Sequence, residues 1–453
     1  MAIVRPFNGM RFTKKAGKIE DLCCPPYDII SEEERKALLK KNANNIVRLE
    51  LPREKGDPYK KAKACLDKWM EDGVLAIDEQ PCFYIYEERF TVKDQEYSFK
   101  GFIGKVYLYD FDRGIILPHE QTLSKAKEDR FQLMEATACN FSQVYSLYHD
   151  PYGKIDKSVS RLSNRPADQS FTDDDGVTHS LWIVPRCTEV DKISANMAGK
   201  KLYIADGHHR YETALRYRNH LKEEGVISAE GENEADYIMM MLVNMQAPGL
   251  VVFPTHRIIH DLKGYSTAKI IKECQEYFDV GTTKSLETAT AKLNQLYSRS
   301  EKGFCLFDGK KYYMMKLKDA ACMKEFLPDT SAALRHLDVS ILHKLVLEKL
   351  MGIDEENMAN GVNLSYTRNA DEAVKTVEDG KANCCFILNP TRVEEISEVA
   401  LAGEKMPQKS TYFYPKLTTG LVMNKLDRPV EKPPEEHKKF DYVEPEVEVV
   451  PVP

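Results

Sequence analysis

A run near the middle of the chain combines the side chains that phosphate chemistry uses. It reads Asp206-Gly207-His208-His209-Arg210, so a carboxylate, two imidazoles and a guanidinium fall within one turn. A glycine between a strand and a helix lets backbone N–H groups approach an anion, and the helix start adds a positive dipole end. Side-chain packing alone does not require this combination of charged and titratable groups. The combination therefore favours a phosphate site over the alternative, a solvated surface turn.

A second cluster is Pro118-His119-Glu120-Gln121, followed by helix-favouring residues. The proline fixes the approach of the chain, which places Glu120 at or near a helix start. Its carboxylate could accept a proton from a substrate hydroxyl if it were partly desolvated. From the spacing alone, a helix-capping role for His119 and Glu120 is favoured.

Two weaker clusters follow. Lys409, Ser410 and Thr411 put a cation and two hydroxyls in a loop after a helix. This composition suits a carboxylate or phosphate ligand, and an ordinary turn explains it equally well. His256 and Arg257 end a strand and could add positive charge around an anion, although such a pair is more often surface decoration.

Common nucleotide and nucleophile motifs do not occur in the sequence. It contains no Gly-x-x-x-x-Gly-Lys-Ser/Thr, no Gly-x-Gly-x-x-Gly and no Gly-x-Ser-x-Gly. The adjacent histidines are not at the i, i+4 spacing of a helical zinc site. The metal that we expect is Mg²⁺, held by Asp206 and phosphate oxygens.

Hydrophobic patterns predict the elements that carry these clusters. Residues 201–204 form an apolar run typical of a buried strand, and a helical stripe follows from Tyr211 to Tyr217. Ser31 and Glu34 have capping-box spacing, and Asp57-Pro58 opens another helix. Further predicted strands are 83–86, 99–103, 144–148, 180–184, 238–243, 303–306, 312–315, 364–366 and 384–388, and further helices are 270–278, 286–297, 340–350, 370–377 and 393–400.

The chain is too long for one core, and the patterns predict a mixed α/β (α+β) protein. We expect five segments. They are an N-terminal α+β segment (1–112), a catalytic core with an insertion (113–262), a helix-rich segment with a hairpin (263–355), a C-terminal α/β domain (356–425) and a disordered tail (426–453).

Composition narrows the function classes. The 453 residues are 42% hydrophobic and 30% charged with a net charge of -7, which argues against nucleic acid as a partner. No apolar run is long enough to cross a bilayer, and the N-terminus lacks a secretory signal, so neither a membrane partner nor secretion is expected. The 11 cysteines are scattered without Cys-x-x-Cys spacing, which is typical of a cytoplasmic protein.

Several blocks, in order, resemble a known family. Residues 205–211 resemble the Asp-Gly-His-His-Arg motif of the free serine kinases, which have a ParB/sulfiredoxin-like fold. Residues 118–121 are similar to the segment that carries the catalytic glutamate there, and 383–387 and 407–415 are similar to parts of that family's C-terminal domain. Over nearly its full length the chain also resembles the DUF1015 proteins, relatives of these kinases and of ParB.

The resemblance implies a ParB/sulfiredoxin-like catalytic core with large insertions and a smaller C-terminal α/β substrate-binding domain. It also implies a phosphotransferase that moves a phosphoryl group between ATP or ADP and free L-serine or O-phosphoserine. Glu120 would be the general base, with His209 as a second catalytic residue. Asp206 would help to hold Mg²⁺, and residues 207–210 would cradle the phosphates.

The resemblance places Lys409, Ser410 and Thr411 against the amino acid. His256 and Arg257, judged from their residue types alone, are further candidates for binding the substrate. The family has an arginine where this chain has Thr411, and Lys409 cannot reproduce its bidentate fork. The direction of transfer stays open, as do two alternatives: a phosphoserine phosphatase in serine biosynthesis and a ParB-like nucleotide-binding regulator.

Overall fold

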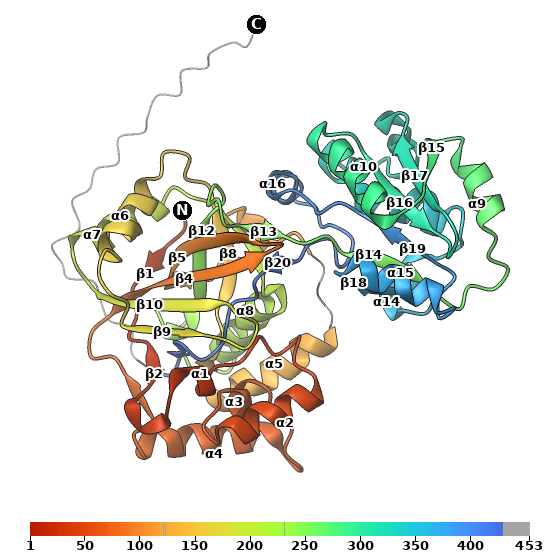
Figure 1. The fold of residues 1–453 in the computed structure, drawn as a ribbon. Coiled ribbons are helices and arrows are strands. Elements are labelled where there is room, and N and C mark those ends of the chain that lie inside the picture. The colour runs from red at the N-terminus through yellow and green to blue at the C-terminus, as the bar shows by residue number, and fades with distance from the viewer. Residues whose placement is uncertain (121, 123, 231, 429–453) are drawn as a thin grey trace, which may run out of the picture.

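Two large sheets organise the chain (Figure 1). The computed structural model describes residues 1–120, 122, 124–230 and 232–428. One sheet has nine strands and lies in a large body, and the other has six strands and lies in a second unit beside it. Helices cover both sheets, so the predicted mixed α/β class is confirmed.

The nine-stranded sheet is mixed, with the order β6-β11-β8-β12-β5-β4-β10-β9, and β1 also pairs with β5. Its central strand β12 runs parallel to β8 and antiparallel to β5. The strands are β1 (Val4–Arg5), β4 (Cys82–Val92), β5 (Gln95–Tyr107), β6 (Ile116–Leu117), β8 (Val144–Tyr148), β9 (Gln169–Thr172), β10 (Thr178–Pro185), β11 (Leu202–Asp206) and β12 (Tyr237–Asn244).

Both faces of this sheet are buried. On β12, Met240 and Leu242 pack into one core with the helices, whereas Met241 and Val243 pack into a second core on the opposite face. This alternation follows from the two-residue period of a strand, and the strand predicted over 238–243 is confirmed. The helices of the first core are α5 (Ser124–Thr137), α6 (Lys154–Leu162), α7 (Thr188–Met197) and α8 (His208–Glu223).

Short N-terminal elements form a helical layer at the base of the large body in Figure 1. The capping box at Ser31 and Glu34 is present, and Asp57 caps the helix that Pro58 opens, both as predicted. The elements are β2 (Met10–Phe12), α1 (Ile19–Leu22), α2 (Glu32–Lys41), α3 (Val47–Glu50), α4 (Pro58–Glu71) and β3 (Leu75–Ile77).

The second unit contains a six-stranded sheet with the order β15-β17-β16-β19-β14-β18. Its strands are β14 (His256–Ile259), β15 (Phe278–Thr283), β16 (Gly303–Phe307), β17 (Tyr312–Leu317), β18 (Leu364–Thr367) and β19 (Cys384–Ile387). The helices that lie between β14 and β20 in the sequence are α9 (Thr267–Cys274), α10 (Leu286–Ser298), α11 (Met323–Phe326), α12 (Ala332–Arg335), α13 (Asp338–Ile341), α14 (Glu355–Asn360), α15 (Ala370–Glu378) and α16 (Val393–Leu401).

Hydrogen-bonded pairing crosses three of the expected segment boundaries. The boundary at 112/113 separates β1, β4 and β5 from the rest of their sheet, and those at 262/263 and 355/356 both cut the six-stranded sheet. Strand partners lie far apart in sequence, as β14 and β19 do, so local patterns predict the strands without predicting their neighbours. The helix expected over 340–350 also differs: α13 ends at Ile341 and a π-helix covers Leu342–Glu348.

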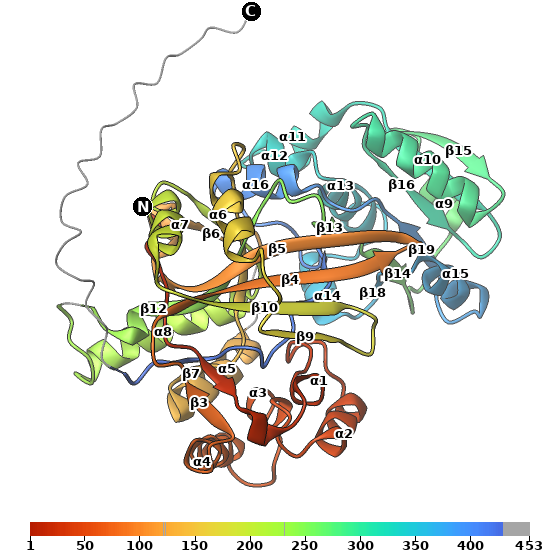
Figure 2. The ribbon, with the colours of Figure 1, turned by 60° about the vertical axis from the view of Figure 1, so that its left-hand side comes forward.

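The chain leaves the large body and returns to it at the same place. Strand β13 (Val251–Val252) pairs with β20 (Phe413–Tyr414), and the second unit lies between them in sequence. The returning segment then pairs with β7 (Cys139–Asn140) through β21 (Asn424–Lys425), so it belongs to the large body (Figure 2). From residue 429 on, the predicted tail lies outside the described residues.

Among the described residues, we find no helix with the length and apolar content that a membrane span requires.

Candidate active site

The strand–glycine–helix turn forms as predicted. Strand β11 ends at Asp206, and Gly207 follows with a φ of 89°, ahead of α8, which begins at His208. A Cβ atom at position 207 would lie 2.9–3.0 Å from atoms of the Arg210 guanidinium. Both the left-handed backbone and this contact therefore require glycine, and the turn places the helix start beside the Asp206 side chain.

Two cations hold the Asp206 carboxylate. Arg210 Nη2 donates to Asp206 Oδ2 over 2.7 Å, and Lys416 Nζ donates to Oδ1. Burial alone would raise the pKa of Asp206, but Lys416 and Arg210 outweigh it and lower that pKa to about 2. The carboxylate is therefore ionised, and both ammonium and guanidinium stay fixed at the start of α8.

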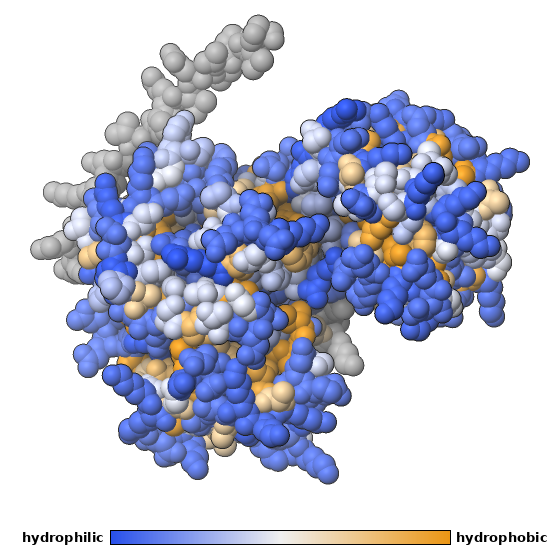
Figure 3. Space-filling model, in the orientation of Figure 1, coloured by the Kyte–Doolittle hydropathy of each residue, from blue (hydrophilic) through white to orange (hydrophobic). Residues whose placement is uncertain are grey.

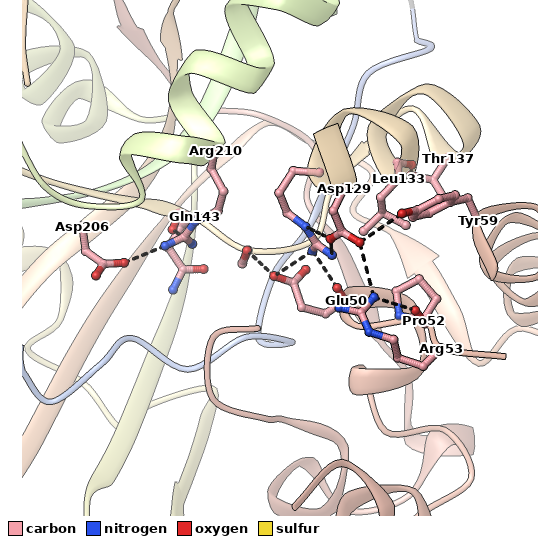
Figure 4. A network of polar contacts seen from close by, with 12 residues as sticks. Glu50, Pro52, Arg53, Tyr59, Asp129, Leu133, Thr137, Gln143, Asp206 and Arg210 are labelled. Carbon is pink, nitrogen blue, oxygen red and sulfur yellow. Dashed lines mark hydrogen bonds and ion pairs between the residues drawn. The ribbon is translucent and has the colours of Figure 1, made fainter. Parts of the chain in front are cut away.

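Arg210 is also held from the opposite side (Figure 4). Its Nη1 donates to the backbone oxygen of Gln143, so the guanidinium bridges Gln143 and Asp206. Next to Gln143, Ser142 donates to the buried Glu50 carboxylate over 2.8 Å. Arg130 donates to the backbone oxygen of Glu50, which extends this polar network into the N-terminal helices. Arg210 is thus fixed in one orientation before any ligand arrives.

The Glu120 carboxylate reaches the same turn. Its Oε2 lies 4.0 Å from His208 Nδ1, and its Oε1 accepts the backbone N–H of Lys409 over 3.4 Å. Burial raises the pKa of Glu120, and Lys409 opposes that rise, while the side chain remains 30% exposed. A carboxylate of this kind can accept a proton and still be reached by a small molecule.

The backbone of Glu120 forms an isolated β-bridge with the backbone of Met406. Glu120 pairs in parallel with Met406, whose N–H donates to the His119 oxygen over 2.8 Å, and α5 begins only at Ser124. This pairing brings Glu120 to the 406–416 segment. The fourth residue of its cluster, Gln121, lies outside the described residues.

His119 and His208 form a buried, perpendicular ring pair with centroids 4.7 Å apart. Burial lowers the pKa of His119 to about 4 and that of His208 well below its ordinary value, so both rings are neutral near pH 7. His208 Nε2 accepts the backbone N–H of His119 over 3.3 Å, which leaves the proton on Nδ1, the atom that faces Glu120. Both ring nitrogens of His208 therefore face protein groups: Nε2 faces the His119 backbone and Nδ1 faces Glu120.

His209, the predicted second catalytic residue, is half-buried on the first turn of α8. Burial lowers its pKa, while the charges of Asp28 and Glu212 oppose this shift. The charge of Lys409 also acts on it. His209 and Glu120 thus lie within electrostatic reach of the same lysine.

The Lys409–Thr411 loop packs against the glutamate segment. Thr411 Oγ1 lies 3.0 Å from His119 Nε2, and the buried Ser410 hydroxyl donates to the Pro407 oxygen. Lys409 has a φ of 56° and an exposed side chain. Of the three predicted substrate residues, Lys409 presents its side chain to solvent, and the two hydroxyls are engaged within the protein.

His256 and Arg257 lie behind this loop. Both are nearly fully buried, at 3% and 1% exposure, so the surface-decoration interpretation is wrong. Arg257 Nη2 donates to the Lys409 oxygen over 3.3 Å, and its Nε donates to His343. His256 Nδ1 accepts the N–H of Leu388 over 3.2 Å. Arg257 thereby supports the Lys409 loop from inside the protein.

The donor set at Asp206 does not fit the expected Mg²⁺. Both of its oxygens accept from cations, and a metal ion there would have to displace Lys416 or Arg210. Within the described ranges, no group of three or more His, Cys, Asp or Glu side chains could hold a metal ion. Lys416 and Arg210 supply positive charge where the prediction placed the metal.

Sequence reasoning missed Lys416 and gave His119 only a capping role. Lys416 stands 210 positions after Asp206, and no local pattern predicts that contact. The available signal was a lysine that follows the Lys409–Thr411 loop closely, directly after Pro415.

The family described as "Protein of unknown function (DUF1015)" matches residues 4–340. A search of the curated proteins finds no match.

Solved structures give distant likenesses. A conserved hypothetical protein from Pyrococcus furiosus is 16% identical, with a TM-score of 0.33, over 69% of this chain and 92% of that one. A free serine kinase in complex with AMP is 13% identical, with a TM-score of 0.32, over 69% and 88%. SbnI with a C-terminal truncation, from Staphylococcus aureus, is 11% identical, with a TM-score of 0.33, over 70% and 85%.

Likenesses at these identities and TM-scores establish neither the activity nor the ligands of this chain. The family match is different, because it spans well over half of the 453 residues. The chain belongs to the DUF1015 family.

Proposed function

We propose that this chain is a phosphotransferase that moves a phosphoryl group between a nucleotide, ATP or ADP, and the hydroxyl of free L-serine. The observation that carries the proposal is the position of Glu120. Its partly buried carboxylate lies 4.0 Å from His208, the first residue of α8, beside the fixed cations of the Asp206–Arg210 turn.

The reaction follows from these positions. Glu120 accepts the proton of the serine hydroxyl while the serine oxygen forms a bond to the terminal phosphorus. The bond from that phosphorus to the bridging oxygen breaks, and the electron pair leaves with the shortened nucleotide. Lys416, Arg210 and the start of α8 offset the negative charge on the moving group and on the leaving phosphate.

Three groups position Glu120. The Lys409 N–H holds Oε1, and His208 directs its Nδ1 proton towards Oε2. His119 in turn fixes the His208 ring through its backbone N–H. Such preorganisation supports a base that keeps its geometry between turnovers. The exposed Lys409 ammonium is the group that we assign to the carboxylate or phosphate of the amino acid.

A phosphoserine phosphatase is the second candidate, favoured by the 30% exposure of Glu120, which lets water reach the base. In that reaction water would replace the serine hydroxyl as the nucleophile.

The test uses the purified protein with O-phosphoserine and Mg²⁺, with and without ADP, and in the forward direction with serine and either nucleotide. Nucleotide-dependent transfer supports the kinase, and phosphate release without ADP supports the phosphatase. If no mixture gives phosphoryl transfer or phosphate release, both the kinase and the phosphatase proposals are contradicted.

Glu120→Gln separates chemistry from folding. We expect turnover to fall by about 10²–10⁴-fold while nucleotide affinity is retained, because the amide keeps the shape but cannot accept the proton. Glu287→Gln, at an exposed position on α10, is the matched control and should leave turnover unchanged. If Glu120→Gln keeps full activity, Glu120 is not the base.

A further inference from the structure

A cavity of about 330 Å³ has Lys416 in its lining, the residue that pairs with Asp206 in the Asp206–Arg210 turn. Its walls come from the segment 20–30, from α2, from the segment 171–177 that includes the end of β9, and from the returning segment 412–418. Figure 3 shows apolar residues in the hollow between the N-terminal helices and the strands above them. A volume of this size is typical of a small-molecule site.

The walls combine rings with carboxylates. Phe171, Tyr412 and Tyr414 line the cavity with aromatic rings, and Ile30 and Leu38 add aliphatic surface. The protein already covers part of these rings, since Phe171 stacks on His179, Tyr414 stacks on Phe253, and Lys416 lies over Tyr412. The remaining lining includes Glu20, Glu34, Asp173, Asp174 and Asp175. Aromatic faces stack on planar rings, and carboxylates accept from N–H groups on a ring edge. A purine has both features.

Lys416 connects this cavity to the candidate active site. It lines the cavity, its ammonium lies 4.6 Å from the centroid of the Tyr412 ring, and it donates to Asp206 at the end of β11. A ligand with a ring in the cavity would therefore extend its phosphates past Lys416 towards Gly207 and Arg210.

We propose that this cavity binds the purine base of the nucleotide, an inference that rests on the proposed function. The nucleotide would enter with its ring among Phe171, Tyr412 and Tyr414 and its phosphates along Lys416. Its terminal phosphorus would then face the serine that Glu120 activates. The N-terminal helices would in this way contribute to nucleotide recognition, a role that the Asp206–Arg210 motif does not predict.

Binding calorimetry tests the inference with two probes, ADP and inorganic pyrophosphate. Pyrophosphate carries the charge but lacks the ring. Ala37 is exposed on α2 and lines the cavity, so Ala37→Trp should fill the cavity without disturbing the fold. We expect it to weaken ADP binding at least tenfold and to change pyrophosphate affinity by less than twofold. Ala291→Trp, exposed on α10, is the matched control and should change neither.

A second variant, Tyr414→Leu, removes a ring without filling space and should also weaken ADP selectively. Wild-type protein should bind ADP and GDP at least tenfold more tightly than CDP and UDP. Thermal unfolding of each variant confirms that it folds.

The outcomes separate the two proposals. If both variants bind ADP as the wild type does, or lose ADP and pyrophosphate affinity equally, or if the base makes no difference, the cavity is not the purine site. In that case, phosphotransfer by the wild type would still support the proposed function. If the wild type binds neither probe and transfers no phosphate, both proposals fail.

Discussion

At the scale of single residues, Glu120 differs from a surface glutamate because burial disfavours its charged form. Burial raises its pKa, and the charge of Lys409 works against that rise. A base must be ionised to accept a proton, so the rate should fall as the pH falls through this raised pKa.

We therefore expect an acid limb in the pH profile of kcat/KM, with its midpoint above about 4.3, the ordinary value for glutamate. Lys409→Met should move that midpoint to higher pH, because it removes the cation that lowers the pKa of Glu120. The exposed Lys284→Met is the control and should leave the profile unchanged. A limb that stays in place in Lys409→Met would contradict this coupling.

Lys416 carries a second prediction at this scale. Its side chain is 14% exposed and its ammonium pairs with Asp206, so it offers charge to an anion without having to be ordered first. Lys416→Met should weaken pyrophosphate binding at least tenfold, or about 1.4 kcal/mol. Lys416→Arg should lose less pyrophosphate affinity than Lys416→Met, and the control Lys284→Met should leave pyrophosphate binding unchanged. Unchanged binding in Lys416→Met would place the phosphate elsewhere.

At the scale of elements, the β11–Gly207–α8 unit is the part that sequence reasoning predicted best. An apolar run, a glycine and a 3.6-residue stripe are local signals, and the structure has the strand, the turn and the helix where they indicate. The type of the helix predicted over 340–350 was harder to predict from the sequence. Its apolar residues can form the buried face of an α-helix and equally that of the observed π-helix.

Gly207→Ala tests this unit. The left-handed backbone and the contact with Arg210 should lower the free energy of unfolding by about 1–3 kcal/mol and weaken anion binding. Gly199→Ala is the matched control, since its added Cβ would meet no atom within 4 Å, and its stability should stay within about 0.5 kcal/mol. Chemical denaturation measures both. Equal stability of the two variants would mean that the turn is not strained.

At the scale of the whole molecule, the site depends on contacts that no local pattern reveals. From the sequence, Arg257 is expected to be a surface cation, but it is buried and donates a hydrogen bond to the Lys409 loop. The pairing of β14 with β19 likewise joins two segments that the sequence patterns assigned to different domains. The residue types of the site were therefore predictable in large part, whereas their partners and the unit boundaries were not.

The strands of the two sheets pack into separate cores, although α13 and α16 contribute residues to one core of the nine-stranded sheet. The separate strand cores predict unfolding in more than one step. The two tryptophans, Trp69 and Trp182, both lie in the large body, so their fluorescence reports that body alone. Leu306→Ala, in the six-stranded sheet, should cost about 2–5 kcal/mol and shift far-UV circular dichroism without shifting fluorescence. Leu242→Ala should shift the fluorescence. One shared transition in both variants would show a single cooperative unit.

Asp206 leaves the ribosome 210 positions before Lys416. At about 5–20 residues per second, this gap lasts roughly 10–40 s. During that time the strands that flank Asp206 have already been made, but the ammonium that neutralises its carboxylate has not. A chain that stops before this lysine therefore lacks one of the two cations that hold the Asp206 carboxylate.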